Sequence, residues 1–62
     1  MTPDDLRAAR GRLGLTQAEL GKALRLPGGR SVRRWETPGN EVPGPVQVAV
    51  ELMVAVKERK VA

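Results

Sequence analysis

The 62-residue sequence has no cysteine, histidine, phenylalanine or tyrosine, and its single aromatic residue is Trp35. The lack of cysteine excludes disulfide bonds and thiolate metal ligands. The lack of histidine removes the side chain that most often serves as general base or zinc ligand. A chain of this length buries only about 60% of its unfolded surface and has little room for a deep pocket. We therefore expect one non-enzymatic domain over residues 1–62, without metal or other cofactor.

Negative charge is also scarce. Eleven lysines and arginines oppose seven aspartates and glutamates, so the net charge is +4. Such a surplus favours anionic partners: nucleic acid, acidic proteins or anionic membrane surfaces. The most apolar segment, residues 42–56, is too short to span a bilayer and contains Gln47 and Glu51. The acidic start M-T-P-D-D does not have the pattern of a signal peptide. These features predict a cytoplasmic protein that does not enter the membrane.

Capping signals predict the first two of four short helices. The first helix is expected to begin with Thr2 as N-cap and Pro3 at its first position, and to stop at Gly14. The second begins at the capping box T-Q-A-E, residues 16–19, and runs to about position 24 or 25. The turn P-G-G, residues 27–29, then interrupts the chain, because glycine tolerates positive φ and proline cannot continue a helix.

The third predicted helix is R-S-V-R-R-W-E, residues 30–36, and Pro38 limits it to about two turns. At 100° per residue, Arg30, Arg33 and Arg34 fall within an arc of about 100°. Val32 and Trp35 lie roughly opposite this arc. The helix is therefore expected to be short and amphipathic, with a basic outer face.

The last helix is predicted over about residues 45–59, after a loop that Val42 anchors. This helix is apolar nearly all round. One explanation is that the other three helices wrap it. We favour the alternative that one of its faces is exposed and pairs with a second copy of the chain. The candidates for this dimer contact are Val48, Leu52, Val54 and Val56.

Two short helices joined by a tight turn that contains glycine, the second with a basic free face, indicate a helix-turn-helix over about residues 16–36. A helix fits the major groove of B-DNA, and arginine can form two hydrogen bonds with a guanine edge there. Val32 and Trp35 would fix this helix to the core from behind. The pattern therefore predicts binding to double-stranded DNA.

The run L-R-x-x-R-x-x-x-G-L-T-Q-A-E-L-G-x-x-L, followed by S-V-R-R-W-E, resembles the lambda-repressor-like, Cro/C1 (XRE-type) family of DNA-binding regulators. The likeness is close over residues 6–36 and loose elsewhere. It implies an all-α fold, a compact four-helix bundle that contains a helix-turn-helix. It also implies a transcriptional regulator, foremost a repressor, that binds an inverted repeat as a homodimer.

The resemblance also implies roles for individual residues. Gln17 matches a phosphate-contacting position, and Arg33 matches a position beside the DNA backbone. The full set of candidate DNA-binding residues is Gln17, Gly29, Arg30, Ser31, Arg33 and Arg34. Arg25 stands where the turn of the motif normally has glycine, so the start of the recognition helix stays open.

Other residues match structural positions of the family. Gly21 matches the small residue that lets the two motif helices approach each other. Arg10 and Glu36 match a charged pair between the first helix and the recognition helix. Independently of the resemblance, Arg10 lies on the apolar stripe of the first helix and needs a partner there. The predicted structural core of the motif comprises Leu20, Gly21, Leu24, Val32 and Trp35.

Other functions remain open from the sequence. The apolar last helix would also suit an antitoxin-like or adaptor module that binds another protein, with DNA binding secondary. The arginines of residues 30–34 could form an ordinary solvated face. RNA binding is less favoured, because Trp35 is assigned to the core and no other aromatic residue can stack on bases.

Overall fold

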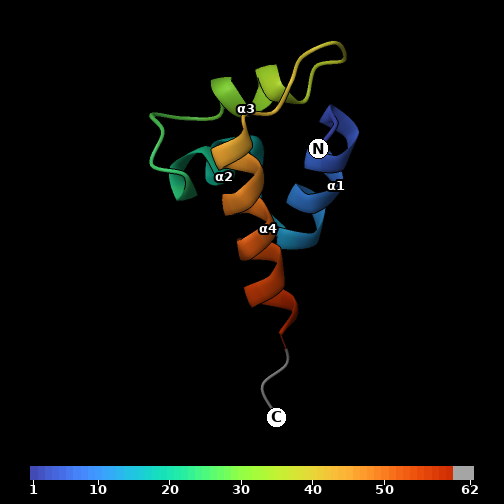
Figure 1. Cartoon of the computed structure of the whole chain (residues 1–62). Coiled ribbons are helices and arrows are strands. Elements are labelled where there is room, and N and C mark those ends of the chain that lie inside the picture. The colour runs from blue at the N-terminus through green and yellow to red at the C-terminus, as the bar shows by residue number, and fades with distance from the viewer. Residues whose placement is uncertain (60–62) are drawn as a thin grey trace.

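The computed structural model describes residues 1–59, and all regular structure in this range is helical. Its helices are α1 (Pro3–Leu13), α2 (Gln17–Ala23), α3 (Arg30–Trp35) and α4 (Gly44–Glu58). Figure 1 shows α3 lying across one end of the molecule, near the start of α4, while the rest of α4 runs away from it. The expectation of a compact, all-α chain of four helices is confirmed, and the helix ends lie within two residues of the predicted ones.

Capping boxes begin α1 and α2. The Thr2 hydroxyl accepts the N–H of Asp5 at 3.1 Å, and the Asp5 carboxylate accepts the N–H of Thr2 at 3.0 Å. Thr16 and Glu19 repeat the arrangement at 3.1 and 2.8 Å. Each box satisfies two backbone donors that the first turn of a helix leaves without partners. The predicted box at residues 16–19 is therefore confirmed.

A left-handed residue follows the last turn of α1 and of α2. Gly14 has a φ of 68° after α1, and Arg25 has a φ of 65° after α2. At the second site the N–H of Leu26 donates to the carbonyl of Gly21 at 2.8 Å, which closes the helix end. This conformation suits glycine, but it costs other residues about 1–2 kcal/mol. Arg25 is thus strained at the position where the resemblance leads one to expect glycine.

Two glycines allow close packing between α2 and the segment that follows it. A Cβ atom on Gly21 would overlap the carbonyl oxygen of Gly28, so Gly21 lies against the turn rather than against α3 itself. A Cβ atom on Gly29 would lie only 2.7 Å from the backbone nitrogen of Ala18. Gly29 therefore brings the start of α3 against the start of α2.

Aliphatic side chains from every helix and from the α3–α4 loop form the core. The buried members are Leu6, Leu20, Val32, Val42 and Val50. Val42 is 3% exposed and anchors the loop, as the sequence predicts. In so small a core, each of these side chains contributes a large share of the buried apolar surface.

Leu24 and Trp35, predicted to be buried in the motif, are only partly buried and pack against the core from its edge. They therefore belong to the edge of the core rather than to its fully buried centre. Trp35 follows Val32 by three residues, or 300°, so its side chain points about 60° away from that of Val32. Val32 points into the core, and the larger indole covers the rim.

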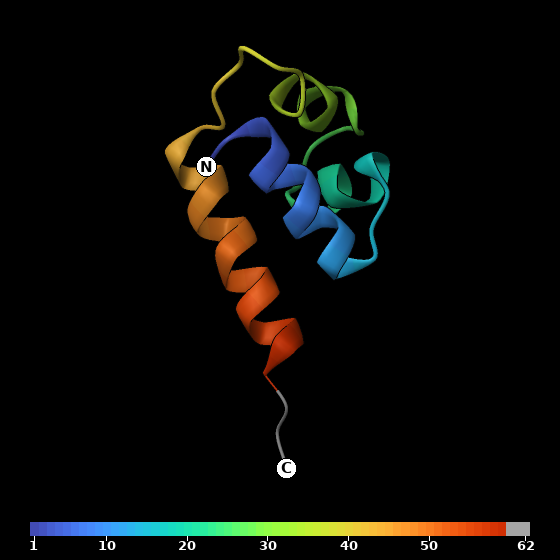
Figure 2. The same cartoon turned by 90° about the vertical axis from the view of Figure 1, so that its right-hand side faces the viewer.

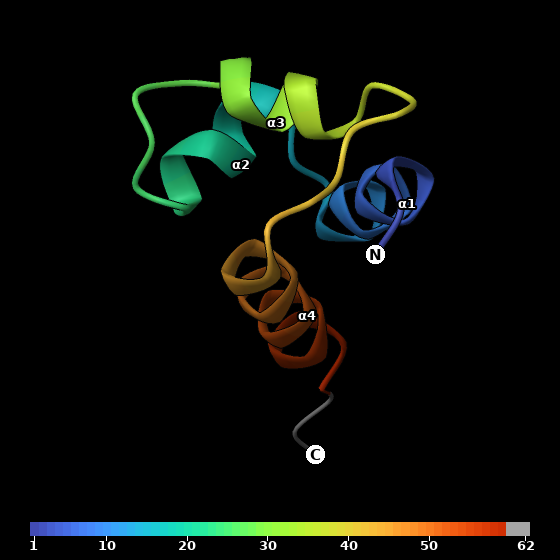
Figure 3. The same cartoon turned by 45° about the horizontal axis from the view of Figure 1, so that its top comes forward.

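The other helices cover α4 on one side only. α1 packs against α4, and α2 packs against α3. Figures 2 and 3 both show α1, α2 and α3 on the same side of α4. Val50 on the covered side is buried, whereas Val48 is 56% exposed. The explanation that three helices wrap a central last helix is therefore wrong.

Glycine-to-alanine substitutions test the close approach at Gly21. Gly11→Ala, where a Cβ atom meets nothing within 4 Å, should stabilise the protein by about 0.5–1 kcal/mol through helix propensity. Gly21→Ala gains the same propensity, but it should destabilise the protein by about 1–3 kcal/mol because the turn must shift. Urea unfolding measures both free energies. Stabilisation by both substitutions would show that α2 and the turn are not in close contact.

Replacement of the left-handed arginine should stabilise the fold. Arg25→Gly removes the backbone strain, and we expect a gain of about 1 kcal/mol in the free energy of unfolding. Lys22→Gly removes the same charge from the last turn of α2, where helical geometry disfavours glycine, and should instead cost up to about 1 kcal/mol. Thermal and urea unfolding of the two variants give the comparison. Equal effects would contradict the strain at Arg25.

Candidate nucleic-acid interface

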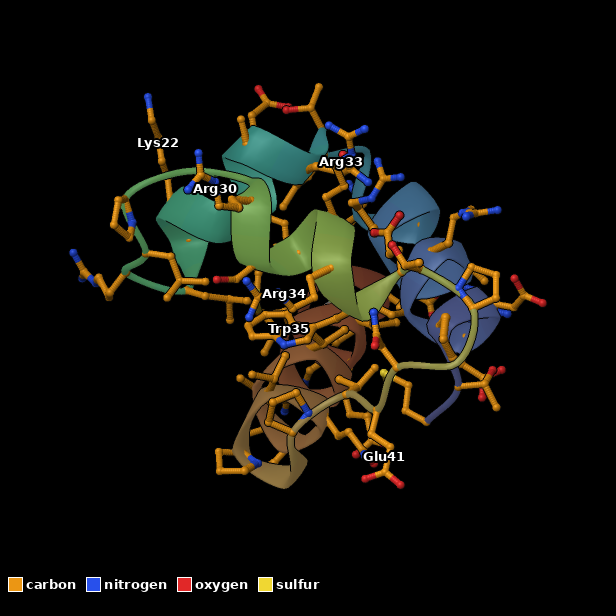
Figure 4. The ribbon with its side chains drawn as sticks, turned by 90° about the horizontal axis from the view of Figure 1, so that it is seen from above. Lys22, Arg30, Arg33, Arg34, Trp35 and Glu41 are labelled. Carbon is orange, nitrogen blue, oxygen red and sulfur yellow. The ribbon has the colours of Figure 1, made fainter. Side chains whose placement is uncertain are left out.

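The outer face of α3 is cationic. Arg30, Arg33 and Arg34 are exposed, whereas Val32 on the opposite face is fully buried. Figure 4 shows Arg30 and Arg33 on one side of α3 and Arg34 nearer to Trp35. The helix therefore carries positive charge on both sides of its exposed ridge.

Lys22 of α2 extends this cationic surface. Its side chain is exposed and lies on the same side of the molecule as Arg30 and Arg33 (Figure 4). The sequence prediction missed it because contacts outside α3 were inferred from the resemblance alone. A signal was available, because Lys22 lies 200° from the buried Leu20 and so must face away from the core.

The α3–α4 loop holds the end of α3. A helix of six residues is unstable alone, so α3 depends on tertiary contacts. The Thr37 hydroxyl donates to the Arg33 carbonyl at 2.9 Å, and the Asn40 amide donates to the Arg34 carbonyl at 2.7 Å. These bonds satisfy carbonyl groups that the helix end leaves free. They also fix the direction in which the chain leaves α3.

The predicted ion pair between Arg10 and Glu36 is present. Arg10 Nε donates to Glu36 Oε2 at 2.7 Å, and Arg10 Nη2 donates to Oε1 at 3.1 Å. Arg10 Nη1 also donates to the carbonyl of Leu15 at 3.0 Å. Glu36 is 3% exposed, so the carboxylate is inside the protein. This bidentate pair joins α1 to the residue that directly follows α3.

Two further side chains complete the contacts of Glu36. Gln17 Nε2 donates to Glu36 Oε1 at 3.2 Å. Arg7 Nη2 donates to the Glu36 backbone carbonyl at 3.4 Å, and Arg7 Nε lies 3.7 Å from Oε1. The resemblance implies a phosphate contact for Gln17, and in the structure one N–H of its amide is bonded to Glu36. The Glu36 carboxylate thus connects α1, α2 and α3.

Opposing influences set the pKa of Glu36. Burial of the carboxylate raises the pKa, whereas the hydrogen bonds from Arg10 and Gln17 lower it, as do the charges of Arg10 and Arg7. The net result is a pKa below the ordinary value for glutamate. The hydrogen bond to Glu36 likewise raises the pKa of Arg10. The pair is therefore charged at neutral pH.

Two of the remaining candidate residues are less exposed than the arginines. Gly29 is the N-cap of α3 and packs on the α2 backbone, which gives it a structural position. Ser31 is partly buried next to Val32. The freely projecting candidates are therefore Arg30, Arg33 and Arg34.

The ion pairs formed within residues 1–59 do not involve the arginines of α3. They join Arg7 to Glu36, Arg10 to Glu36, and Arg12 to Glu58. In this part of the chain, acidic side chains neutralise cations of α1 rather than those of α3. The guanidinium groups of α3 therefore remain accessible to an external anion.

Comparisons of the chain with protein-family models, with curated proteins and with solved structures found no match. Within residues 1–59, no helix has both the length and the apolar composition that crossing a membrane requires. What this site can bind is therefore inferred from its own side chains. A narrow cationic helix with an anchored back is suited to contact a polyanion that has a groove of matching width.

The Glu36 carboxylate should make stability depend on pH. Its folded pKa lies below the unfolded value, so its stabilising contribution is present above about pH 4.3 and is lost as pH falls through the folded pKa. Glu36→Gln should flatten this acid-dependent part of the unfolding curve. Glu41→Gln, at an exposed carboxylate in the loop, should retain it. Urea unfolding between about pH 3 and pH 7 measures the slopes.

Removal of Arg10 should reverse the direction in which the stability of the protein changes with pH. In Arg10→Met, burial outweighs the weaker partners that remain and should raise the pKa of Glu36. Stability is then highest below the unfolded pKa and falls as pH rises through the folded pKa. We expect a loss of about 3–5 kcal/mol at neutral pH, partly recovered by acidification. Circular dichroism measures the folded fraction, and an unchanged pH slope would contradict the assigned role of Arg10.

Proposed function

We propose that this protein is a sequence-specific regulator of transcription that binds double-stranded DNA. In this proposal α2 and α3 act as a helix-turn-helix, and α3 enters the major groove. The observation that carries the proposal is the exposed row of Arg30, Arg33 and Arg34 on a helix that Val32 and Glu36 fix from behind. Ion pairs with acidic residues of the same chain would neutralise these three arginines. The ion pairs within residues 1–59 involve other residues.

The arginines have different roles in this proposal. Arg30 lies near the centre of the arc of arginines and Arg34 at its edge nearer to Trp35, and both contact base edges or phosphates. Arg33 lies on the same side as Lys22 (Figure 4), and both contact phosphates along one edge of the groove. Phosphate contacts set position and affinity, whereas contacts to base edges give sequence preference.

The Glu36 network supports the orientation of α3. Its carboxylate pairs with Arg10 and lies near Arg7 close behind the helix, and it joins α3 to α1 and α2. The basic surface is consequently held on a rigid frame. Recognition of base edges requires such preorganisation, because lateral displacement of the helix breaks the paired hydrogen bonds to guanine.

A homodimer on an inverted repeat is part of the proposal. A single short helix reads few base pairs, and a pair reads half-sites about 34 Å apart on one side of the duplex. The exposed Val48, Leu52 and Val56 of α4 support self-association. Val54, predicted together with them, is partly buried against the core and is removed from this set. Occupancy of an operator can by itself block transcription, so we propose a cytoplasmic repressor.

A protein-interaction module is the second candidate. One apolar groove favours it, at the junction of the end of α1 with the second half of α4. The groove is lined by Leu13, Leu15, Leu52, Met53, Val56 and Lys57. A module of this kind would bind a second polypeptide stoichiometrically and would bind duplex DNA without sequence preference. Selection of bound duplexes from a random library therefore separates the two functions.

Alanine substitution in α3 tests the proposed function. Arg34→Ala should weaken binding to the best selected duplex by about 1–3 kcal/mol and relax preference at one base position. Arg12→Ala on α1 removes the same charge at a side chain that pairs with Glu58 of α4, and it should change neither quantity. The affinity of the wild type should fall as salt concentration rises. In a plot of the logarithm of the binding constant against the logarithm of salt concentration, each neutralised phosphate contributes about −0.9 to the slope. Arg34→Ala affinity equal to wild type would reject the assigned DNA face.

A further inference from the structure

The loop between α3 and α4, residues 36–43, contains a tight turn next to the end of α3. Pro38 at the second position and Gly39 at the third, with a φ of 91°, are the residues and the backbone conformation of a type II turn. The N–H of Asn40 donates to the carbonyl of Thr37 at 3.2 Å and closes this turn. Figure 1 shows the loop beside α3 at the same end of the molecule. The loop and α3 therefore face the same partner.

Glu41 lies between two residues that the fold holds in place. Before it, the Asn40 amide donates to the Arg34 carbonyl at 2.7 Å. After it, Val42 is buried in the core, and its carbonyl accepts a hydrogen bond from the Gln47 amide at 2.9 Å. The Glu41 side chain itself is exposed. The fold consequently keeps an exposed carboxylate beside the C-terminal end of α3.

The Glu41 carboxylate takes no part in the ion pairs formed within residues 1–59. Other carboxylates in this part of the chain do have partners inside the protein. Asp5 and Glu19 accept the backbone N–H groups of capping boxes, and Glu36 accepts two hydrogen bonds from Arg10. The charge of Glu41 is therefore available to act on a molecule that approaches α3.

The two sides of α3 differ in charge. Figure 4 shows Lys22 and Arg33 on one side of the helix and Glu41 on the other, beyond Arg34. The cations suit phosphates, whereas a carboxylate is repelled by phosphates and by the acceptor atoms O6 and N7 of guanine. A carboxylate can instead accept a hydrogen bond from the amino group that cytosine or adenine presents in the major groove.

We infer that Glu41 is a specificity-determining residue, which lowers the affinity for most duplexes and is accommodated where a base amino group lies opposite its carboxylate. The inference rests on the proposed function, because that function places α3 in the major groove. Specificity is a difference between affinities, and a contact that penalises the wrong sites increases it. A protein of net charge +4 is attracted to the phosphates of any duplex, so such a penalty improves discrimination.

Neutralisation of single carboxylates tests the inference. Glu41→Gln preserves the size of the side chain and removes its charge. Glu51→Gln is the matched control, because it removes an equal charge from an exposed carboxylate two turns into α4. Neither carboxylate forms an ion pair within residues 1–59, so both variants should fold, which circular dichroism verifies. Affinities are measured for the duplex recovered by selection and for duplexes of random sequence.

We expect Glu41→Gln to bind random duplexes about two- to fivefold more tightly than the wild type does. This is the effect of removing one unit charge about 4–8 Å from a phosphate in water. Affinity for the selected duplex should not increase, so the ratio of the two affinities falls. Glu41→Lys should tighten binding to random duplexes further and make it more dependent on salt. Glu51→Gln should leave both affinities unchanged.

An unchanged ratio of affinities in Glu41→Gln would overturn the inference. Equal tightening on both kinds of duplex gives this result, and it would show that Glu41 repels DNA without selecting a sequence. Equal effects of Glu41→Gln and Glu51→Gln would also overturn it, because the effect would then come from net charge alone. A wild type that binds selected and random duplexes equally would instead reject the proposed function, and this inference with it.

Discussion

The carboxylate of Glu36 is the contact on which the arrangement of α1, α2 and α3 depends. It accepts two hydrogen bonds from Arg10 and one from Gln17, with Arg7 nearby. A buried charge is tolerated only when it is paired and hydrogen-bonded, so these partners must stay in place for α3 to stay in place. The network is specific in geometry as well as in charge, because the planar guanidinium of Arg10 matches both carboxylate oxygens.

This polar contact matters more here than it would in a larger protein. Within residues 1–59 the core has five buried aliphatic residues, and the single indole covers its edge rather than filling its centre. A six-residue helix joined to such a core gains little from its own backbone hydrogen bonds. The Glu36 network and the side chains of Thr37 and Asn40 therefore fix α3 at both its core side and its C-terminal end. Hydrogen bonds replace part of the apolar contact that a longer helix would have.

Local signals in the sequence predicted much of this fold. Capping residues such as Thr16 and Gly14 act through bonds to their own neighbours, so their effect can be inferred without tertiary structure. The Arg10–Glu36 pair was predictable because a cation on an apolar stripe requires a partner and the resemblance named one. The all-α class followed from the same signals.

Other features depend on geometry that spacing alone does not define. The partial burial of Trp35 and of Val54 depends on the depth of the core at each position, and helical periodicity gives only direction. The engagement of Gln17 depends on the distance between α2 and Glu36. Lys22 was overlooked although its direction was predictable, because its nearness to Arg30 follows from the packing of α2 on α3 (Figure 4).

The outward arginines of α3 have a final consequence for how the protein can diversify. Their side chains make no ion pair within residues 1–59, and the loop bonds at the end of the helix use backbone carbonyls. Arg30, Arg33 and Arg34 can therefore be exchanged while Val32 and Glu36 preserve the frame. Under the proposed function, new target preferences would arise by substitutions at these surface positions. Gly21 and Gly29, in contrast, lie too close to neighbouring backbone atoms to carry a side chain without a shift of the chain.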